Sequence, residues 1–389
     1  MSIIKDKNLK ALTANEAQAL AMKQIEPDVV AAYPITPATQ VVEIFSQYVA
    51  DGEVKTEFIP VESEHSAMSA CIGASAAGAR VMTATSSQGL VLMQEILNIA
   101  SGLRFPIVMA EVNRALSAPL NIHGDQSDTM GARDTGWIQI FTSTVQEAYD
   151  SMFIALKLAE KVNLPAMVTT DGFILSHCME AFYSISDDRI KKFIGQRKPE
   201  YSLFDFENPK TIGSLDLPDF FYEHKRQQIE AMREANFELK KVQKEFFNLS
   251  GRKYDLVEEY KLKDADYGIV VLGSTAETAK TAIDNLRKKG YKIGLLRIRL
   301  FRPFPDKEIM NAIKHLKVVA VFDKADAVSG IGGPVYSEVK AALYGNCRGK
   351  VLNYIYGLGG RDTRIEQLEQ AFSQLKNNEN EINYLGVRE

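Results

Sequence analysis

The strongest constraint on the fold is a regular alternation of short apolar segments with helical segments along the first half of the chain. Segments such as DVVAAY, RVMTAT and FPIVMAEV are short and bounded by turn residues, as buried strands are. The helical segments include NEAQALAMKQI, which Thr13 and Glu16 are placed to cap as a capping box. Strands that alternate with helices predict a mostly parallel sheet covered by helices on both faces.

The alternation stops near residue 187 and resumes near residue 263. The intervening stretch is rich in charged and aromatic residues, and its clearest element is HKRQQIEAMREANFELKKVQKEF. Apolar residues of this element fall roughly on one helical stripe, formed by Ile229, Met232, Leu239, Val242 and Phe246. Two interpretations stay open: a connecting helix packed along one face, or a docking helix for another subunit.

The last third of the chain predicts a second α/β unit. Strand-like segments IVVLG, KIGLLRIRLF, KVVAVFD and KVLNYIY alternate with helical ones, of which GPVYSEVKAALYG is an example. We therefore divide the chain into residues 1–190, a connecting arm at residues 191–262, and residues 263–389.

Composition excludes several classes of function. The chain is 46% apolar and 25% charged, as average globular proteins are, and its net charge of −4 offers no basic surface for nucleic acid. No apolar run is long enough to cross a bilayer, and MSIIKDKNLK lacks the apolar region of a signal peptide. We expect a cytoplasmic protein without a nucleic-acid or membrane partner.

Metal-binding patterns are absent from the sequence. The three cysteines, Cys71, Cys178 and Cys347, are far apart, and none belongs to a CxxC pair. The five histidines show no spacing typical of metal ligands. The sequence therefore predicts neither a metal site nor an iron–sulfur cluster in this chain.

Three polar residues follow predicted strands, at the edge where open parallel sheets bind their ligands. Thr36 follows DVVAAY, Glu64 follows KTEFIPV at a helix start, and Arg114 follows FPIVMAEV. Because parallel strands present their carboxyl ends at one edge, the coincidence of these three residues predicts a binding site there.

Each of the three also has a simpler interpretation, and the residues alone leave both open. Arg114 suits bidentate binding of a carboxylate, but also an ordinary surface ion pair. Thr36 suits a bond to a substrate oxygen, or to its own backbone. Glu64 suits a buried catalytic acid, or a first-turn residue favoured by the helix dipole. Glu62 competes with Glu64 for the catalytic role.

Taken as a set, the motifs YPITP, PVESEHSA, GASAAGAR, TATSSQGL, VNRAL, GDQSD and DGFILSH resemble a known family. They are similar to the alpha subunit of pyruvate:ferredoxin oxidoreductase, among the thiamine-diphosphate-dependent 2-oxoacid:ferredoxin oxidoreductases. RIRLFRPFP and GLGGRD resemble the second domain of that family. The resemblance implies an α/β fold with a pyrimidine-type thiamine-diphosphate-binding domain and a smaller domain like the C-terminal domain of transketolase.

The resemblance also implies roles for the three residues. Thr36 matches the threonine that hydrogen-bonds the bound 2-oxoacid, and Arg114 matches the arginine that binds its carboxylate. Glu64 matches the glutamate that hydrogen-bonds the aminopyrimidine ring of thiamine diphosphate, the cofactor that decarboxylates the substrate. The implied reaction converts pyruvate and coenzyme A to acetyl-CoA and CO2 while ferredoxin is reduced.

Further parts of such an enzyme are expected on partner chains. No GDG segment is present, so a beta subunit is expected to bind the diphosphate and Mg2+. Without CxxC motifs, the 4Fe-4S clusters are expected on gamma and delta subunits or their equivalents, and coenzyme A is expected to enter from another subunit. The isolated chain is expected to be inactive.

Three alternatives stay open. A branched-chain 2-oxoacid, such as 2-oxoisovalerate, is the nearest rival to pyruvate as substrate; oxalate is disfavoured because the oxalate enzyme carries an arginine at the position of Thr36. The chain could belong to a thiamine-dependent dehydrogenase or transketolase-like enzyme that does not use ferredoxin. It could also be a noncatalytic scaffold subunit.

Overall fold

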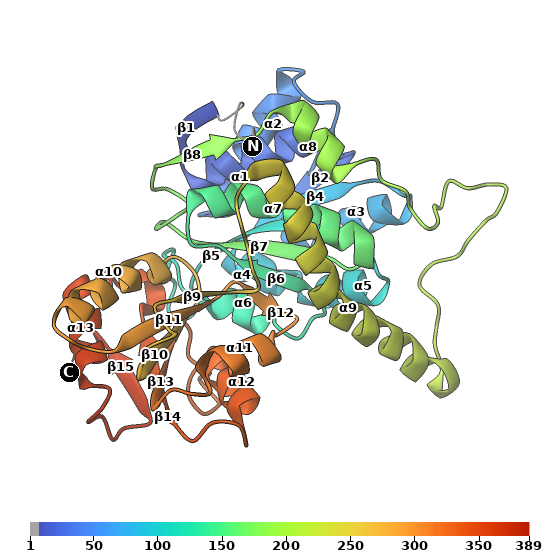
Figure 1. Ribbon diagram of the computed structural model, residues 1–389. Coiled ribbons are helices and arrows are strands. Elements are labelled where there is room, and N and C mark those ends of the chain that lie inside the picture. Colours follow the sequence, from blue (N-terminus) through green and yellow to red (C-terminus); the bar gives the residue numbers. More distant parts are fainter. Residues whose placement is uncertain (1–7, 389) are drawn as a thin grey trace.

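A mostly parallel sheet forms the centre of the N-terminal unit in the computed structural model, which describes residues 8–388 (Figure 1). Within these residues the sheet has seven strands in the order β12-β6-β7-β5-β4-β2-β3, and all but β12 are parallel. The bounds are β2 Val29–Ala32, β3 Glu57–Pro60, β4 Val81–Thr85, β5 Val108–Asn113, β6 Ile138–Phe141, β7 Ala166–Asp171 and β12 Leu300–Arg302. We call this sheet and the helices packed on it the N-terminal unit.

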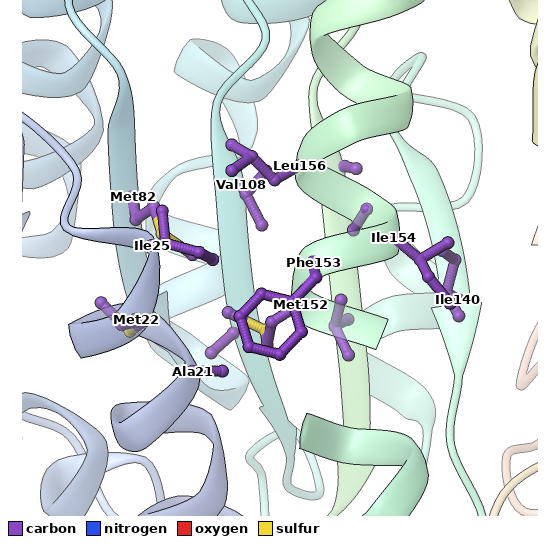
Figure 2. Packing of buried hydrophobic residues seen from close by; sticks show 14 of the residues in the cluster. Ala21, Met22, Ile25, Met82, Val108, Ile140, Met152, Phe153, Ile154 and Leu156 are labelled. Atoms are coloured by element: carbon purple, nitrogen blue, oxygen red, sulfur yellow. The ribbon is translucent and has the colours of Figure 1, made fainter. Parts of the chain in front are cut away.

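Helices cover both faces of this sheet, as the alternation predicts. One face carries α1 Ala14–Ile25, α2 Thr39–Ala50 and α7 Val145–Val162, with α8 Asp187–Ile194 and α9 Pro218–Ser250 packed beside α7. The other face carries α3 Glu64–Ala76, α4 Ser87–Leu92 and α5 Gln94–Gly102. Figure 2 shows Met152 and Phe153 of α7 in the buried cluster that also contains Met22 of α1 and Val108 of β5.

The expected helix caps are present. The Glu16 amide donates to Thr13 Oγ1 at 3.3 Å, and the Thr13 amide donates to the Glu16 carboxylate at 2.7 Å, so the predicted capping box is confirmed. Ser63 caps α3 by accepting a bond from the Ser66 amide. These caps fix where two helices begin, and the second of them places Glu64 in the first turn of α3.

A second parallel sheet forms the centre of the C-terminal unit, which we define as this sheet with its helices. Within the described residues it has six strands in the order β15-β14-β13-β10-β11-β9, with β9 antiparallel. The strands are β9 Val257–Tyr260, β10 Tyr267–Val271, β11 Ile293–Ile298, β13 Val318–Asp323, β14 Lys350–Tyr356 and β15 Ile382–Leu385. One face is covered by α10 Thr275–Lys288 and α13 Ile365–Gln374, the other by α11 Asp306–Ile313 and α12 Pro334–Leu343. The turn after β14 forms the short 3-10 helix η1, Leu358–Gly360.

Several elements differ from the sequence-based expectation. The predicted single strand KIGLLRIRLF divides at Arg299, and its second part, β12, leaves to pair with β6 of the other unit. The segment after Asn113 contains α6 Ser127–Gly131 and then β6, neither of which was among the expected elements. In the apolar segment LVLMQEILNIAS, the end of α4 and the helix α5 meet at Met93. A small antiparallel pair, β1 Asn8–Leu12 with β8 Glu180–Ser184, was also not predicted.

The long helix α9 packs against α7 with most of the predicted stripe, since Leu239, Val242 and Phe246 are buried and only Ile229 of the stripe is exposed. Ile229 is 46% exposed, whereas Ala231 and Ala235 are buried. Small alanine side chains let the two helices approach closely, which an apolar stripe of larger residues does not reveal. The first half of α9 extends away from the body of the molecule (Figure 1).

MSIIKDKNLK is the segment that lacks the apolar region of a signal peptide, and its first seven residues lie outside the described part of the chain. Across residues 8–388, no helix combines the length and apolar character that a membrane span requires. The proposed division at residues 190 and 262 stays a prediction.

Arginines of the RIRLFRPFP motif tie the two units together. Arg297 of β11 donates two hydrogen bonds, each 2.6 Å long, to the carboxylate of Glu147 in α7. Arg299 donates to Ser151 Oγ at 2.8 Å, and Arg302 at the end of β12 donates both to the carbonyl of Arg133 at 3.0 Å and to Glu338 of α12. Burial alone would raise the pKa of Glu147, but the charge of Arg297 outweighs it and the pKa is lowered. The motif therefore serves as a polar joint between the units.

We predict that Glu147→Gln lowers the free energy of unfolding by about 3 kcal/mol, because it leaves the buried Arg297 charge only partly compensated. Glu258→Gln is the matched control, since Glu258 pairs with the same arginine at 2.8 Å but is more exposed. We expect this control to cost at most about 1 kcal/mol. Denaturant unfolding of both variants measures the difference, and equal losses would contradict this view of the joint.

Candidate active site

Thr36, Glu64 and Arg114 all lie just beyond the carboxyl ends of parallel strands in the N-terminal unit. Thr36 follows β2, Glu64 follows β3 and Arg114 follows β5. In the sheet β2 lies between β3 and β4, and β4 pairs with β5. The structure thus places the three predicted residues at one edge of one sheet.

Arg114 and Thr36 are in direct contact. Nη1 of Arg114 donates to the carbonyl of Thr36 at 3.0 Å, and Nε donates to the carbonyl of Asn121 at 3.0 Å. Arg114 is only 8% exposed, yet no carboxylate among the described residues forms an ion pair with it, and Nη2 has no acceptor there. The guanidinium is therefore held by neutral acceptors and keeps donor capacity for a ligand.

Asp128 holds the main chain at Arg114 in place through hydrogen bonds to backbone amides. Its Oδ2 accepts bonds from the amides of Arg114 at 2.8 Å and Ser87 at 3.1 Å. Its Oδ1 accepts from Asn113 Nδ2 at 2.9 Å and from the Thr129 amide at 2.7 Å. Burial raises the pKa of Asp128 to about 6 in spite of these bonds. One carboxylate thus joins the end of β5 to the starts of α4 and α6.

A second carboxyl, Glu111, lies wholly buried in β5 beneath this arrangement. Neither of its oxygens has a hydrogen-bond partner among the described residues, and it stands opposite Thr85 of β4, whose hydroxyl is likewise unpartnered there. Burial, reinforced by the neighbouring Asp128, raises the pKa of Glu111 well above its usual range. This environment favours the protonated, neutral form of the Glu111 carboxyl over the carboxylate.

Glu64 is buried, with 6% exposure, at the first position of α3. No group among residues 8–388 forms a hydrogen bond with its carboxylate. Gly89 of α4 makes room for it, because a Cβ at that position would lie 2.7 Å from Glu64 Oε1 and 2.4 Å from Thr85 Oγ1. The competing residue Glu62 is exposed and accepts a bond from Ser66. Of the two glutamates, Glu64 therefore has the environment of a binding group.

The DGFILSH and YPITP motifs meet beside this edge. A Cβ on Gly172 would lie 2.2 Å from the carbonyl of Asn113 and 3.0 Å from Pro37 Cγ, so only glycine fits between these segments. The ring centroid of the next residue, Phe173, lies 4.8 Å from that of His177 and 4.9 Å from that of His123. These motifs, distant in sequence, form adjoining parts of one surface.

Sequence reasoning did not single out Asp128, Glu111, Gly89 or Asn121. Asp128 ends the GDQSD motif and Gly89 belongs to TATSSQGL, so both lie in stretches that the resemblance used without a role. Glu111 had its own signal, an acid inside the otherwise apolar segment FPIVMAEV. Asn121 carried no local signal, because the acceptor of its side-chain Nδ2, the carbonyl of Gly359, is 238 residues away.

We predict that Glu111→Gln stabilises the chain increasingly as pH rises. A carboxyl whose pKa is raised in the folded state loses stability above its unfolded pKa of about 4.5, at about 1.4 kcal/mol per pH unit, until the folded pKa is reached. Glutamine does not titrate, so the unfolding free energy of the variant relative to wild type should grow from pH 5 to pH 7. Denaturant unfolding at several pH values measures this slope.

Glu26→Gln provides the control for that slope. A hydrogen bond from Lys191 lowers the pKa of Glu26, so its titration lies below pH 5 and its difference from wild type should be constant from pH 5 to pH 7. A flat difference for Glu111→Gln as well would mean that Glu111 is ionised in the fold.

Two family models match the chain. "Pyruvate flavodoxin/ferredoxin oxidoreductase, thiamine diP-bdg" matches residues 20–244, and "Pyruvate:ferredoxin oxidoreductase core domain II" matches residues 265–368. Pyruvate synthase subunit PorA of Thermotoga maritima is 54% identical, covering 97% of this chain and 98% of the relative. Pyruvate synthase subunit PorA of Methanothermobacter thermautotrophicus is 44% identical, covering 98% of this chain and 99% of the relative. Ketoisovalerate oxidoreductase subunit VorA of Pyrococcus abyssi is 45% identical, with coverages of 94% and 93%.

Solved structures support the fold. The 2-oxoglutarate:ferredoxin oxidoreductase from Magnetococcus marinus matches with a TM-score of 0.74 and 21% identity, over 95% of this chain and 65% of that one. This chain therefore spans about two thirds of that solved chain. A split-gene transketolase matches with a TM-score of 0.55 and 11% identity, covering 94% and 98% of the two chains. The predicted α/β fold with thiamine-enzyme architecture is confirmed, and the chain belongs to the pyruvate flavodoxin/ferredoxin oxidoreductase family.

Proposed function

We propose that this chain is the alpha subunit of a pyruvate:ferredoxin oxidoreductase. The enzyme converts pyruvate and coenzyme A to acetyl-CoA and CO2 and passes the electrons to ferredoxin. The observation that carries the proposal is the Arg114 guanidinium, buried beside Thr36 without an anionic partner among the described residues. The 54% identity to a pyruvate synthase subunit supports pyruvate as the substrate.

Arg114 is suited to bind the carboxylate of a 2-oxoacid. Both of its bonded acceptors are main-chain carbonyls, so no protein anion neutralises the guanidinium. A charge held in a largely buried position is weakly screened and attracts a carboxylate more strongly than a surface arginine does. The carbonyl of Thr36 accepts a bond from Arg114 and the residue is exposed, so in this proposal its hydroxyl binds another oxygen of the same small substrate.

Glu64 is suited to bind the aminopyrimidine ring of thiamine diphosphate. Its carboxylate is buried and unpartnered within the described residues, so a ring nitrogen of the cofactor would supply the missing hydrogen bond. Thiamine diphosphate, when bound, supplies the electron sink that a decarboxylation requires. Glu64 would hold a proton at the pyrimidine ring, and Gly89 gives the carboxylate its room.

The diphosphate half of the site, with Mg2+, belongs in this proposal to a beta subunit. Exposed apolar side chains lie on the segments that form the site, close to its polar groups: Tyr33, Val91, Leu92, Leu120, Ile122 and Ile174. Apolar side chains gathered around a polar site are typical of a subunit interface. Gamma and delta subunits or their equivalents would carry the 4Fe-4S clusters that pass electrons to ferredoxin.

A branched 2-oxoacid such as 2-oxoisovalerate is the second candidate substrate. It is supported by the 45% identity to a ketoisovalerate oxidoreductase subunit. The carboxylate and 2-oxo groups are common to both substrates, so Arg114 and Thr36 serve either one. Comparing turnover of the two acids by the reassembled complex separates these candidates.

We predict that Arg114→Ala lowers kcat/KM for pyruvate by about a hundredfold in the reassembled complex, as expected for loss of about 3 kcal/mol of carboxylate binding. Pyruvate- and coenzyme-A-dependent reduction of ferredoxin is the assay. Arg226→Ala is the control, since Arg226 is an exposed residue of α9 that pairs with Glu230. Unchanged kinetics for Arg114→Ala would refute the carboxylate role and leave the noncatalytic scaffold as the better interpretation.

We also predict that Glu64→Gln lowers kcat by about a hundredfold or more at saturating thiamine diphosphate, because the amide cannot take part in proton transfer. Glu62→Gln is a closely matched control, two residues away and exposed, and we expect it to retain wild-type turnover. If the Glu62 variant loses activity and the Glu64 variant does not, the assignment of the two glutamates is reversed.

A further inference from the structure

Asn121 connects the C-terminal unit to the guanidinium of Arg114. Its carbonyl accepts the 3.0 Å bond from Arg114 Nε, and its side-chain Nδ2 donates to the carbonyl of Gly359 at 2.9 Å. Its Oδ1 accepts a 2.7 Å bond from the amide of His123. One residue therefore touches Arg114 with its backbone and the η1 turn with its side chain.

The η1 turn is shaped to receive this loop. A Cβ on Gly359 would lie 2.4 Å from Asn121 Nδ2, and a Cβ on Gly360 would lie 2.3 Å from the Cβ of His123. The amide of Gly359 also donates to Asp125 Oδ2 at 3.0 Å. Asn121 and Asp125 thus bind the carbonyl and the amide of the same glycine, on either side of its Cα.

The loop needs such an anchor. It leaves β5 at Arg114 and is closed at its base by a bond from the Ala115 amide to the His123 carbonyl. Leu120 and Ile122, on either side of Asn121, are exposed. The Asn121 carbonyl is one of only two acceptors that orient the guanidinium among the described residues, so its position depends on what holds this part of the loop.

We propose that Asn121 is a positioning residue, through which the GLGG turn of the C-terminal unit sets the orientation of Arg114 for the substrate carboxylate. The inference rests on the proposed function, since it assigns Arg114 to the substrate. A carboxylate bound by two parallel hydrogen bonds tolerates little displacement of the guanidinium. Substrate recognition in the N-terminal unit thereby depends on a contact with the C-terminal unit.

Asn121→Asp tests the proposal with a minimal change. Aspartate keeps an oxygen for the His123 amide, but it replaces the donor to Gly359 with an acceptor. In the reassembled complex we expect KM for pyruvate to rise about tenfold, with KM for coenzyme A and kcat at saturating pyruvate within about twofold of wild type. A role in folding or assembly alone would instead lower activity with every substrate and leave KM for pyruvate unchanged, and that result would overturn the proposal.

Gly359→Ala approaches the same contact from the other side. Its Cβ would push against Asn121 Nδ2, and we expect the same selective rise in KM for pyruvate. Gly345→Ala is the matched control, because Gly345 has φ +73°, close to the +60° of Gly359, but a Cβ there meets no atom within 4 Å. An equal rise in KM for both alanine variants would assign the effect to backbone strain and contradict the proposal.

Combining the substitutions separates this inference from the proposed function. In an Arg114→Ala background, Asn121→Asp should cause no further rise in KM for pyruvate, because the group that it positions is gone. A rise of the same size in both backgrounds shows that Asn121 acts independently of Arg114 and overturns the positioning role alone. A wild-type KM for Arg114→Ala itself overturns the proposed function and this inference with it.

Discussion

The carboxylate of Asp171 holds the carboxyl edges of the two sheets against each other. Asp171 ends β7 in the N-terminal unit, and its Oδ2 accepts a 2.7 Å bond from the amide of Ser274, which follows β10 in the C-terminal unit. Lys324, which follows β13, places its buried Nζ 3.7 Å from the same carboxylate. Breaking a buried set of this kind leaves uncompensated charge and is costly, so the two edges stay in register. The face-to-face edges bring the η1 turn to the loop that carries Asn121.

Around Arg114 the charges are arranged so that the guanidinium remains available. Two buried acids of this edge do not pair with it: Asp128 accepts bonds from backbone and amide donors, and burial raises the pKa of Glu111 well above its usual range. Carbonyl oxygens, which carry no net charge, orient the guanidinium itself. A carboxylate in either acceptor position would have fixed Arg114 equally well but would have competed with an anionic substrate. In the proposed role of Arg114, orientation of the guanidinium by carbonyls is therefore separate from binding of the substrate.

Local patterns predicted the features of the chain that local interactions determine. The caps at Thr13 and Ser63 depend on residues three positions away, and the alternation of strands and helices placed Thr36 and Arg114 at one edge before any contact was known. The departure of β12 to pair with β6 depends on partners about 160 residues apart, and the bond from Asn121 to Gly359 spans 238 residues. No periodicity in the sequence encodes such pairs. The sequence favoured Glu64 but left Glu62 as a competitor, and the difference in their burial, which depends on the whole fold, separates their environments.

The site carries groups whose hydrogen-bonding capacity the described chain leaves unused, and this has an energetic consequence. The guanidinium of Arg114 is largely buried without an anion among the described residues, which costs folding free energy. The buried pairs of Glu147 with Arg297 and of Asp171 with Lys324 lie in the joint between the units, away from that cost. A ligand that bonds to Glu64 or Arg114 binds the folded chain and not the unfolded one, so its binding offsets part of that folding cost. In the proposed function, the incomplete hydrogen bonding of this edge favours binding of a ligand there, and the joint between the units keeps the edge assembled while the ligand is absent.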